Sequence, residues 1–162
     1  MTALILFSCF PTLWGQTSGK ALIGSWEKVD FPQLELFRLN AKIDTGAYTS
    51  SIHCSSIKKT VFLGIPYVFF RTLDPSHPQY REKLLKMPIF KESKVKNSSG
   101  KVENRIFIKT PVRLAGEMFD IRLSLTNRIE MQAPVLIGRR ALEGRFLVDP
   151  SRKNLKPPQG QP

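Results

Sequence analysis

Cysteine and histidine are both scarce in this sequence, which excludes two common ways of stabilising or activating a small protein. The only cysteines are Cys9 and Cys54, too few for a disulfide framework and without the C-x-x-C spacing of structural zinc sites. The only histidines are His53 and His77, and neither belongs to an H-E-x-x-H pattern. A phosphate-binding G-x-x-x-x-G-K-[ST] loop is also missing. We therefore predict no metal site and no cofactor, and we interpret Cys54 as a small buried hydrophobe.

Acidic residues are also few: 13 stand against 25 lysines and arginines, for a formal net charge of +12. Such a surface attracts nucleic acid, anionic lipid or acidic polypeptides. The basic residues are spread along the chain, so an ordinary basic surface explains them equally well. A nucleic-acid module would need exposed stacking aromatics, but Tyr67, Phe69 and Phe70 follow the pattern of core residues. We expect no specific nucleic-acid partner.

Charge is absent altogether from residues 1–19, which are largely apolar. The apolar part is shorter than the about 20 residues that cross a bilayer, so we expect no membrane span. It suits the core of a secretory signal, although the basic lead-in and the cleavage site are missing, and a misassigned or truncated start explains it equally well. We treat 1–19 as a signal-like or disordered segment, 20–152 as one domain and 153–162 as a flexible tail. The location is periplasmic or secreted if 1–19 is a signal, and cytoplasmic otherwise.

The sequence has no pattern typical of a long amphipathic helix, and the middle of the chain has the pattern of β-strands. Short apolar or alternating runs are separated by Gly, Pro, Asn and Ser at close intervals. One short helix is predicted over residues 138–144, where helix-forming residues stand between two glycines. The predicted strands are 21–31, 36–44, 61–71, 94–97, 102–110, 112–115, 118–125 and 134–137.

The segment Ala41–Ala47 joins an apolar approach to the tripeptide Asp44-Thr45-Gly46. Such a run places a carboxylate at the end of a strand, where glycine lets the backbone turn and bring its amides toward that carboxylate. The tripeptide alone is also an ordinary turn. A second segment, Leu136-Ile137-Gly138-Arg139, places two apolar residues before a glycine and the predicted helix. The two segments together favour chemistry at Asp44.

These segments resemble those of the retropepsin-like aspartic peptidases, and more narrowly of the bacterial branch often labelled ATP-dependent zinc proteases. The resemblance spans residues 23–149 and implies an all-β fold, a retropepsin-like closed β-barrel with one short C-terminal helix. Tyr48 departs from it, since we expect arginine there in this branch, and residues 72–91 have no close match. The matching residues are Ile23-Gly24, Trp26, 41–47, Thr49-Ser50, Ser99-Gly100, Arg105, 125–128, 136–139, 141–142 and 144–149.

The resemblance implies an aspartic endopeptidase, in which two carboxylates share one proton and activate water. Only one Asp-Thr-Gly occurs in the sequence, so the second carboxylate must come from another chain in a two-fold homodimer. By resemblance Asp44 is catalytic, Thr45 braces the pair across the dimer, and Gly46 lets its amide approach the carboxylates.

By resemblance, a hairpin over residues 94–110 is the flap that closes over a polypeptide substrate, and an ordinary surface hairpin is the alternative. Its tip is Asn97-Ser98-Ser99-Gly100. The main alternative to an enzyme is a non-catalytic dimer that holds an extended peptide in the same groove. In either case the residues expected to contact the peptide are the flap tip together with Ala47, Tyr48, Ile137 and Gly138.

Overall fold

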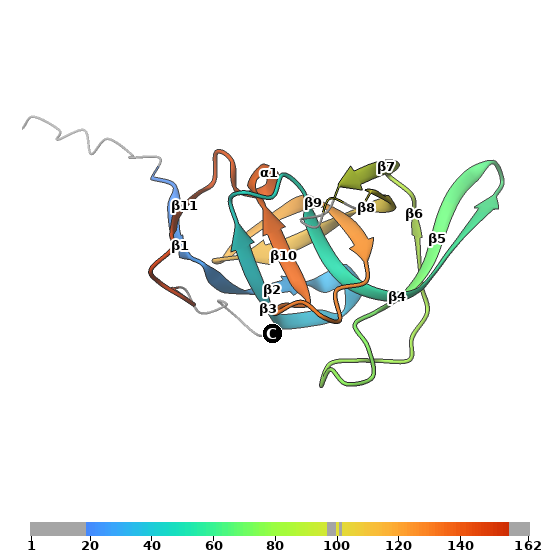
Figure 1. Ribbon diagram of the computed structural model, residues 1–162, viewed down its shortest axis with the longest axis horizontal. Helices are drawn as coiled ribbons and strands as arrows, with labels where there is room; N and C mark the ends of the chain where they lie inside the picture. Colours follow the sequence, from blue (N-terminus) through green and yellow to red (C-terminus); the bar gives the residue numbers. More distant parts are fainter. Residues whose placement is uncertain (1–18, 97–99, 101, 156–162) are drawn as a thin grey trace, which may run out of the picture.

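The computed structural model describes residues 19–96, 100 and 102–155. This part of the chain is almost entirely β, and its one α-helix has four residues (Figure 1). The expected all-β class with one short helix is confirmed. The elements are β1 (Ala21–Gly24), β2 (Trp26–Phe31), the 3-10 turn η1 (Pro32–Leu34), β3 (Leu36–Asp44), β4 (Ser50–Phe62), β5 (Ile65–Thr72), β6 (Leu85–Pro88), β7 (Lys91–Lys96), β8 (Val102–Leu114), β9 (Glu117–Thr126), β10 (Val135–Gly138), α1 (Arg139–Leu142) and β11 (Phe146–Asp149).

The main sheet closes on itself through β10. The strands pair in the order β10-β3-β2-β8-β9-β4, and β4 pairs with β10 again, so these strands form a ring. β10 runs parallel to β3 and antiparallel to β4, and Val135 lies opposite both Ala41 and Ile52. Closure satisfies the backbone groups that a free sheet edge would leave unpaired. It also fixes the strand that ends at Asp44 beside the strand that ends at Gly138.

The register of β3 is fixed by its alternating pattern. Leu39, Ala41 and Ile43 are buried and alternate with the exposed Asn40 and Lys42. Full burial of a large aliphatic side chain is worth about 1.5–3 kcal/mol, and a one-residue slip would turn the whole apolar set toward water. The apolar face of β3 therefore determines where Asp44 stands at the end of the strand.

β4 is the largest departure from the sequence prediction. None of the predicted strands covers residues 45–60, a stretch that includes the polar residues Ser50, Ser51 and His53. The structure begins β4 at Ser50 and buries all three of these residues. Buried polar groups are tolerated when they are hydrogen-bonded, and here Ser50 Oγ accepts from the Gly138 N–H at 3.0 Å and His53 Nδ1 accepts from the Arg128 N–H at 2.7 Å.

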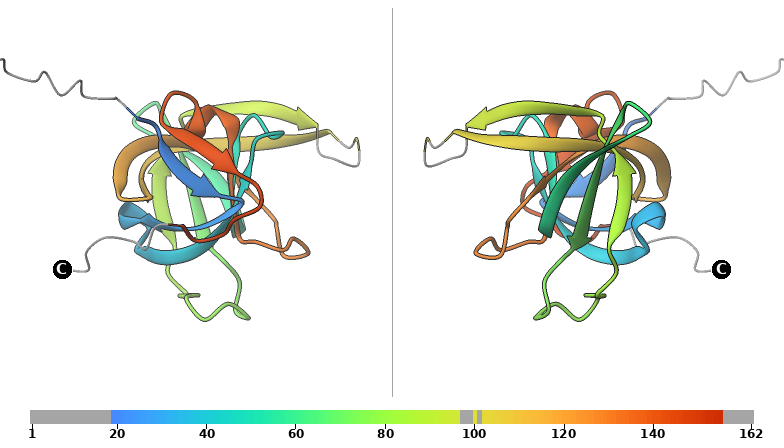
Figure 2. Two further views of the ribbon diagram at one scale, coloured as in Figure 1. Left: turned by 90° about the vertical axis from the view of Figure 1, so that its left-hand side faces the viewer. Right: turned by 90° about the vertical axis from the view of Figure 1, so that its right-hand side faces the viewer.

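Three features extend beyond the ring. β1 and β11 form a separate two-stranded parallel sheet, so the predicted strand 21–31 is broken at Ser25. The β4–β5 hairpin extends far to one side of the body (Figure 1). The β7–β8 hairpin projects in another direction (Figure 2). Among the described residues, no helix is long and apolar enough to span a membrane.

Candidate functional site

Asp44 and Gly138 come together at one end of two parallel strands. Gly138 is opposite Asp44 in the β3–β10 register, so the structure brings the two sequence motifs side by side. A side chain at Gly138 would not fit, since a Cβ there would lie 2.6 Å from the carbonyl carbon of Thr49 and 2.9 Å from the carbonyl oxygen of Ala47. The glycine is thus required by the close approach of the loop that follows Asp44.

The Asp44 carboxylate is oriented by the turn that follows it. Its Oδ1 accepts hydrogen bonds from the Gly46 N–H and the Ala47 N–H, each at 3.0 Å. A Cβ on Gly46 would lie 3.3 Å from the same oxygen, which is tighter than ordinary contact. The predicted approach of backbone amides to this carboxylate is therefore present within the single chain.

The loop between Asp44 and β4 is also held by the residues after β10. The Arg139 N–H donates to the Ala47 carbonyl at 2.7 Å, and the Arg139 guanidinium donates to the Thr45 carbonyl at 3.2 Å. The Arg140 N–H donates to the Tyr48 carbonyl at 3.2 Å. Tyr48 is half exposed, and the guanidinium groups of Arg139 and Arg140 lie over its ring, each 5.8 Å from the ring centre. Helix α1 and the Asp44 loop therefore form one unit.

A cavity of about 1000 Å³ opens beside Asp44. Four predicted site residues line it: Asp44, Gly46, Ala47 and Tyr48. The β7–β8 hairpin, the predicted flap, contributes another wall of the same cavity. From the hairpin the lining includes Lys91, Lys94, Lys96, Arg105 and Phe107, and from the remaining walls Lys42, Arg128, Glu130 and Met131.

The other predicted site residues lie elsewhere. Ile137 is fully buried in the core, and Gly138 is buried beneath the Asp44 loop. Thr45 is exposed and contributes its carbonyl to the contact with Arg139. Gly100 is exposed with a φ of +85°, as a tight turn requires. Asn97, Ser98 and Ser99 lie outside the described residues.

Arg128 faces the same cavity and was not among the predicted site residues. Its guanidinium donates to Ser51 Oγ at 2.9 Å and to the Ala133 carbonyl at 3.2 Å. Burial lowers the pKa of Arg128, the positive charge of Arg105 lowers it further, and the negative charge of Asp44 acts in the opposite direction. Arg105 and Arg128 are both among the residues on which the family resemblance rests. That resemblance could have identified Arg128 as a candidate site residue.

His53 contacts the backbone of Arg128. Its Nδ1 accepts from the Arg128 N–H, and its Nε2 lies 3.3 Å from a carboxylate oxygen of Asp74. Burial lowers the pKa of His53, and the Asp74 carboxylate offsets part of this effect. A neutral ring with its proton on Nε2 suits both neighbours, because Nδ1 must then be the acceptor.

The family model for "RimB-like: Retropepsin-like aspartic endopeptidase RimB" matches residues 22–159. The chain belongs to the RimB-like family. Two similar curated proteins are named probable alpha-L-glutamate ligase. The one from Desulfotalea psychrophila is 36% identical over 140 residues, which cover 84% of this chain and 29% of that protein. The one from Shewanella halifaxensis is 35% identical over 139 residues, which cover 83% of this chain and 30% of that protein. The RimB-like chain thus spans less than a third of the length of these relatives.

A solved structure is also similar to the RimB-like chain. It is the crystal structure of Lpg0085 from Legionella pneumophila, a protein of unknown function, with a TM-score of 0.68 and 28% sequence identity. The match covers 85% of this chain and 98% of that one. The RimB-like fold therefore accounts for nearly the whole of a separately solved chain.

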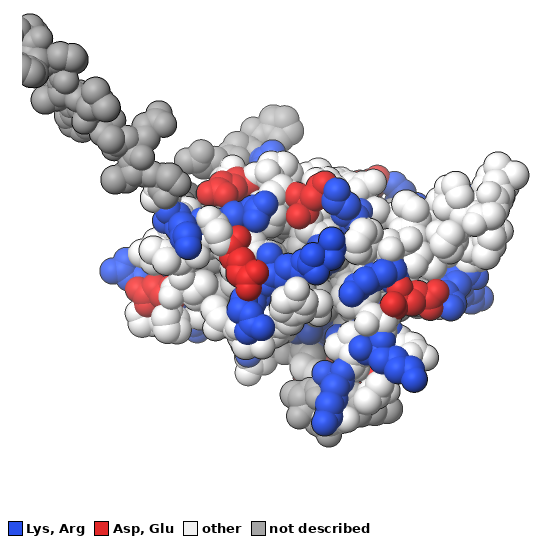
Figure 3. All heavy atoms as spheres, turned by 90° about the horizontal axis from the view of Figure 1, so that it is seen from above, with Lys and Arg blue, Asp and Glu red and all other residues white. Residues whose placement is uncertain are grey.

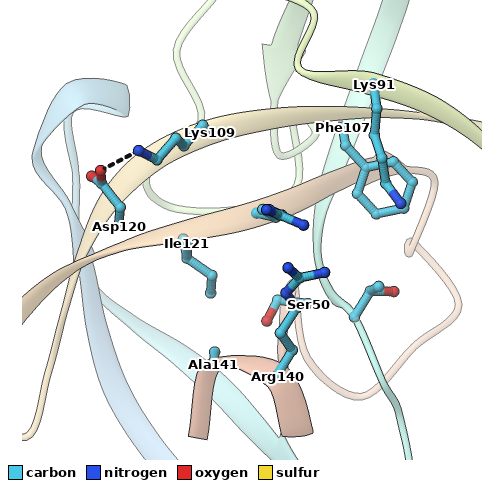
Figure 4. Close-up of a pocket in the computed structure, with 10 residues that line it drawn as sticks. Ser50, Lys91, Phe107, Lys109, Asp120, Ile121, Arg140 and Ala141 are labelled. Carbon is cyan, nitrogen blue, oxygen red and sulfur yellow. Dashed lines mark ion pairs between the residues drawn. The ribbon is translucent and has the colours of Figure 1, made fainter. Parts of the chain in front are cut away.

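A second, smaller cavity of about 220 Å³ adjoins the first in the RimB-like chain (Figure 4). Thr49, Lys91 and Phe107 line both cavities. Its other basic side chains are Lys109, which pairs with Asp120 at 2.8 Å, and Arg122 and Arg140. Basic side chains spread over much of the face seen in Figure 3. Among the described residues, no cluster of three or more His, Cys, Asp or Glu side chains is arranged to hold a metal ion.

Proposed function

We propose that the chain is an aspartic endopeptidase that works as a homodimer, with one catalytic water held between the Asp44 carboxylates of two chains. One observation carries this proposal. The Asp44 carboxylate is oriented by two backbone amides and lines a cavity of about 1000 Å³ whose walls include the β7–β8 hairpin. A carboxylate positioned beside an open groove suits general acid–base catalysis on a bound peptide.

The second carboxylate has no equivalent source within the described chain. The other aspartates are engaged elsewhere, and none of them lines the Asp44 cavity. The other acidic residue on the cavity wall is Glu130, which is exposed on the loop before β10. Because each chain carries one Asp-Thr-Gly, a two-fold axis that passes beside Asp44 would supply the pair.

The proposed reaction uses the pair as a unit that shares one proton, since two like charges so close do not both ionise. The ionised carboxylate takes a proton from water, and the water oxygen attacks the carbonyl carbon of the peptide. The protonated carboxyl gives its proton to the carbonyl oxygen. The carboxyl that took the water proton then gives it to the amine nitrogen as the C–N bond breaks. The other carboxylate takes a proton from one hydroxyl of the diol as the carbonyl forms again, so the pair again shares one proton. Thr45 and Gly46 would hold the two loops in place, and the β7–β8 hairpin would exclude bulk water.

The cavity walls favour a substrate with acidic side chains. Lysines and arginines on the walls greatly outnumber the acids Asp44 and Glu130. Arg128 is held rigidly by Ser51 and Ala133, so its guanidinium is positioned to receive a carboxylate. The name of the curated relatives, probable alpha-L-glutamate ligase, is consistent with a role near glutamate-containing chains. Ala47 and Tyr48 would contact the peptide from the opposite wall.

Cleavage of a peptide library tests this function. Wild-type protein should cut peptides, and Asp44→Asn should lose the activity while it keeps its fold and its dimer. Glu130→Gln is the matched control, because it removes the other carboxylate from the same cavity and should leave turnover largely intact. Loss of activity in Glu130→Gln, with an active monomer in sedimentation, would instead support a catalytic pair within one chain.

Mixing the two proteins tests the shared site. An excess of Asp44→Asn chains should exchange into wild-type dimers and suppress their turnover, because a mixed dimer holds one carboxylate. Suppression that is absent despite measured exchange would contradict the proposal. A wild-type protein that binds peptides tightly, leaves them uncut and binds them equally well as Asp44→Asn would support the non-catalytic alternative.

A further inference from the structure

The β4–β5 hairpin ends in an exposed apolar tip, which has no part in the candidate site. Val61, Phe62, Leu63 and Ile65 are 68%, 55%, 85% and 50% exposed. The tip is a well-formed turn, since Phe62 pairs with Ile65 and the intervening Leu63 and Gly64 have φ angles of +51° and +76°. Positive φ at both central residues is typical of the tight two-residue turns that join antiparallel strands. The backbone therefore holds these side chains out in water.

Both faces of this tip are apolar. Successive residues of a strand point to opposite faces, and Val61 and Phe62 are both more than half exposed. A hairpin that packed on a core would instead show one apolar and one polar face. Exposed apolar clusters of this kind mark surfaces that bind a partner. A tip with apolar side chains on both faces suits a medium that surrounds it, whereas a flat protein surface would cover one face and leave the other in water.

Basic side chains lie between the apolar tip and the body of the protein. The arm from Ser56 to Arg71 contains no acidic residue and carries Lys58 and Lys59. Lys86, on the neighbouring strand β6, places its ammonium 4.7 Å from the ring centre of Phe62 and 4.4 Å from that of Tyr67. Lys59 forms an ion pair with Glu92 of β7, with nitrogen and oxygen 2.9 Å apart. In Figure 3 the arm is the white projection at the right, with blue side chains toward its base.

We propose that this arm docks the protein on an anionic lipid bilayer, with its tip in the boundary between head groups and acyl chains and with Lys58 and Lys86 against the lipid phosphates. Two strand residues on each side of the turn span roughly 7 Å, which fits the about 5–10 Å depth of interfacial segments. Juxtaposed basic residues strengthen such binding to anionic lipid. The arm holds the protein at the surface without crossing it. This inference is independent of the peptidase function.

Sedimentation of the full chain with vesicles tests the proposal. The protein should bind vesicles of equal parts phosphatidylcholine and phosphatidylglycerol and bind pure phosphatidylcholine weakly. Leu63→Asp should weaken binding to the anionic vesicles by about tenfold or more, because it replaces the most exposed apolar side chain of the tip with a charge. Leu147→Asp is the matched control, since Leu147 on β11 is also an exposed leucine (55%) and should leave binding unchanged.

A fluorescence measurement locates the tip directly. Tryptophan introduced as Leu63→Trp should shift its emission to shorter wavelength with anionic vesicles and should be quenched by brominated lipid. Equal vesicle binding by wild type and Leu63→Asp would overturn the proposal, as would equal loss in Leu147→Asp. If wild type fails to bind either vesicle and Leu63→Asp shifts the protein from dimer to monomer, the arm binds a second copy and the lipid proposal is wrong.

Discussion

Gly138 lies opposite Asp44 across the β3–β10 pairing, and its Cα faces the backbone of Thr49 at a distance that leaves no room for a methyl group. The end of β10 therefore sets the path of the loop that orients the Asp44 carboxylate.

Gly138→Ala should destabilise the protein by about 1–3 kcal/mol, because the added Cβ meets backbone atoms that have little freedom to move. Urea unfolding monitored by circular dichroism measures the change. Gly64→Asn is the comparison, since no atom lies within 4 Å of a Cβ at Gly64 and asparagine tolerates its positive φ. Equal losses in the two variants would show that close packing is not the reason for glycine at 138.

Ser50→Ala should cost about 1–3 kcal/mol, because it leaves the buried Gly138 N–H without its acceptor. Ser124→Ala is the matched control. Ser124 is also buried in a strand, but its hydroxyl has no hydrogen-bond partner in the described structure, so its removal should be neutral or stabilising. Thermal or urea unfolding of both variants gives the comparison, and a neutral Ser50→Ala would refute the role of this hydroxyl.

Stability should fall as the pH is lowered through the titration of His53. Burial holds the pKa of His53 below its ordinary value of 6.5, so below that pH the unfolded chain binds a proton that the folded chain does not. The folded state is therefore favoured above about pH 6.5 and loses stability as the pH falls toward the lowered pKa, by up to about 1.4 kcal/mol per pH unit. Protonation would also remove the Nδ1 acceptor from the Arg128 N–H.

Unfolding measured at several pH values checks this slope. His53→Gln should flatten it, because glutamine does not titrate. His77→Gln should preserve it, which assigns the slope to the buried histidine. A wild-type free energy of unfolding that is constant from pH 7 to pH 5 would contradict the prediction.

Arg128→Lys should impair binding of acidic peptides while it leaves turnover of bound peptide less affected, because lysine does not reproduce the forked contacts to Ser51 and Ala133. Under the proposed function this appears as a raised KM with a smaller change in kcat. Arg81→Lys, on an exposed segment outside this cavity, is the control. A lower kcat at unchanged KM would place Arg128 in the chemical step instead.

Turnover of acidic peptides should also weaken as salt is added, since charges on the cavity walls are screened at a distance of about 10 Å in 0.1 M salt. Peptides of the same length with neutral side chains should show little change. The comparison of KM at low and high salt measures the difference, and an identical response of both peptides would exclude an electrostatic preference.

The part played by both Asp44 and Gly138 could be expected from the sequence because their segments together resemble the two motifs of the retropepsin-like peptidases, whereas the local pattern of either segment alone indicates only a strand followed by a turn. The start of β4 could not, since Ser50, Ser51 and His53 are polar and become buried only through partners that are distant in the sequence. The sequence also could not show that the Arg128 side chain faces the cavity, because its orientation depends on the register of the closed ring. The sequence around Leu63 has the pattern of an ordinary strand. Periodicity alone does not show which strands pack on the core and which project from the domain.

The pairing of β1 with β11 has a mechanical consequence. The two strands run in the same direction with Ala21 beside Phe146 and Gly24 beside Asp149. Tension between the incoming and outgoing ends of the domain would load all of these hydrogen bonds in shear, rather than peel them apart one after another. The short outer sheet would then act as a clamp that takes up the force before it reaches the strands that carry Asp44.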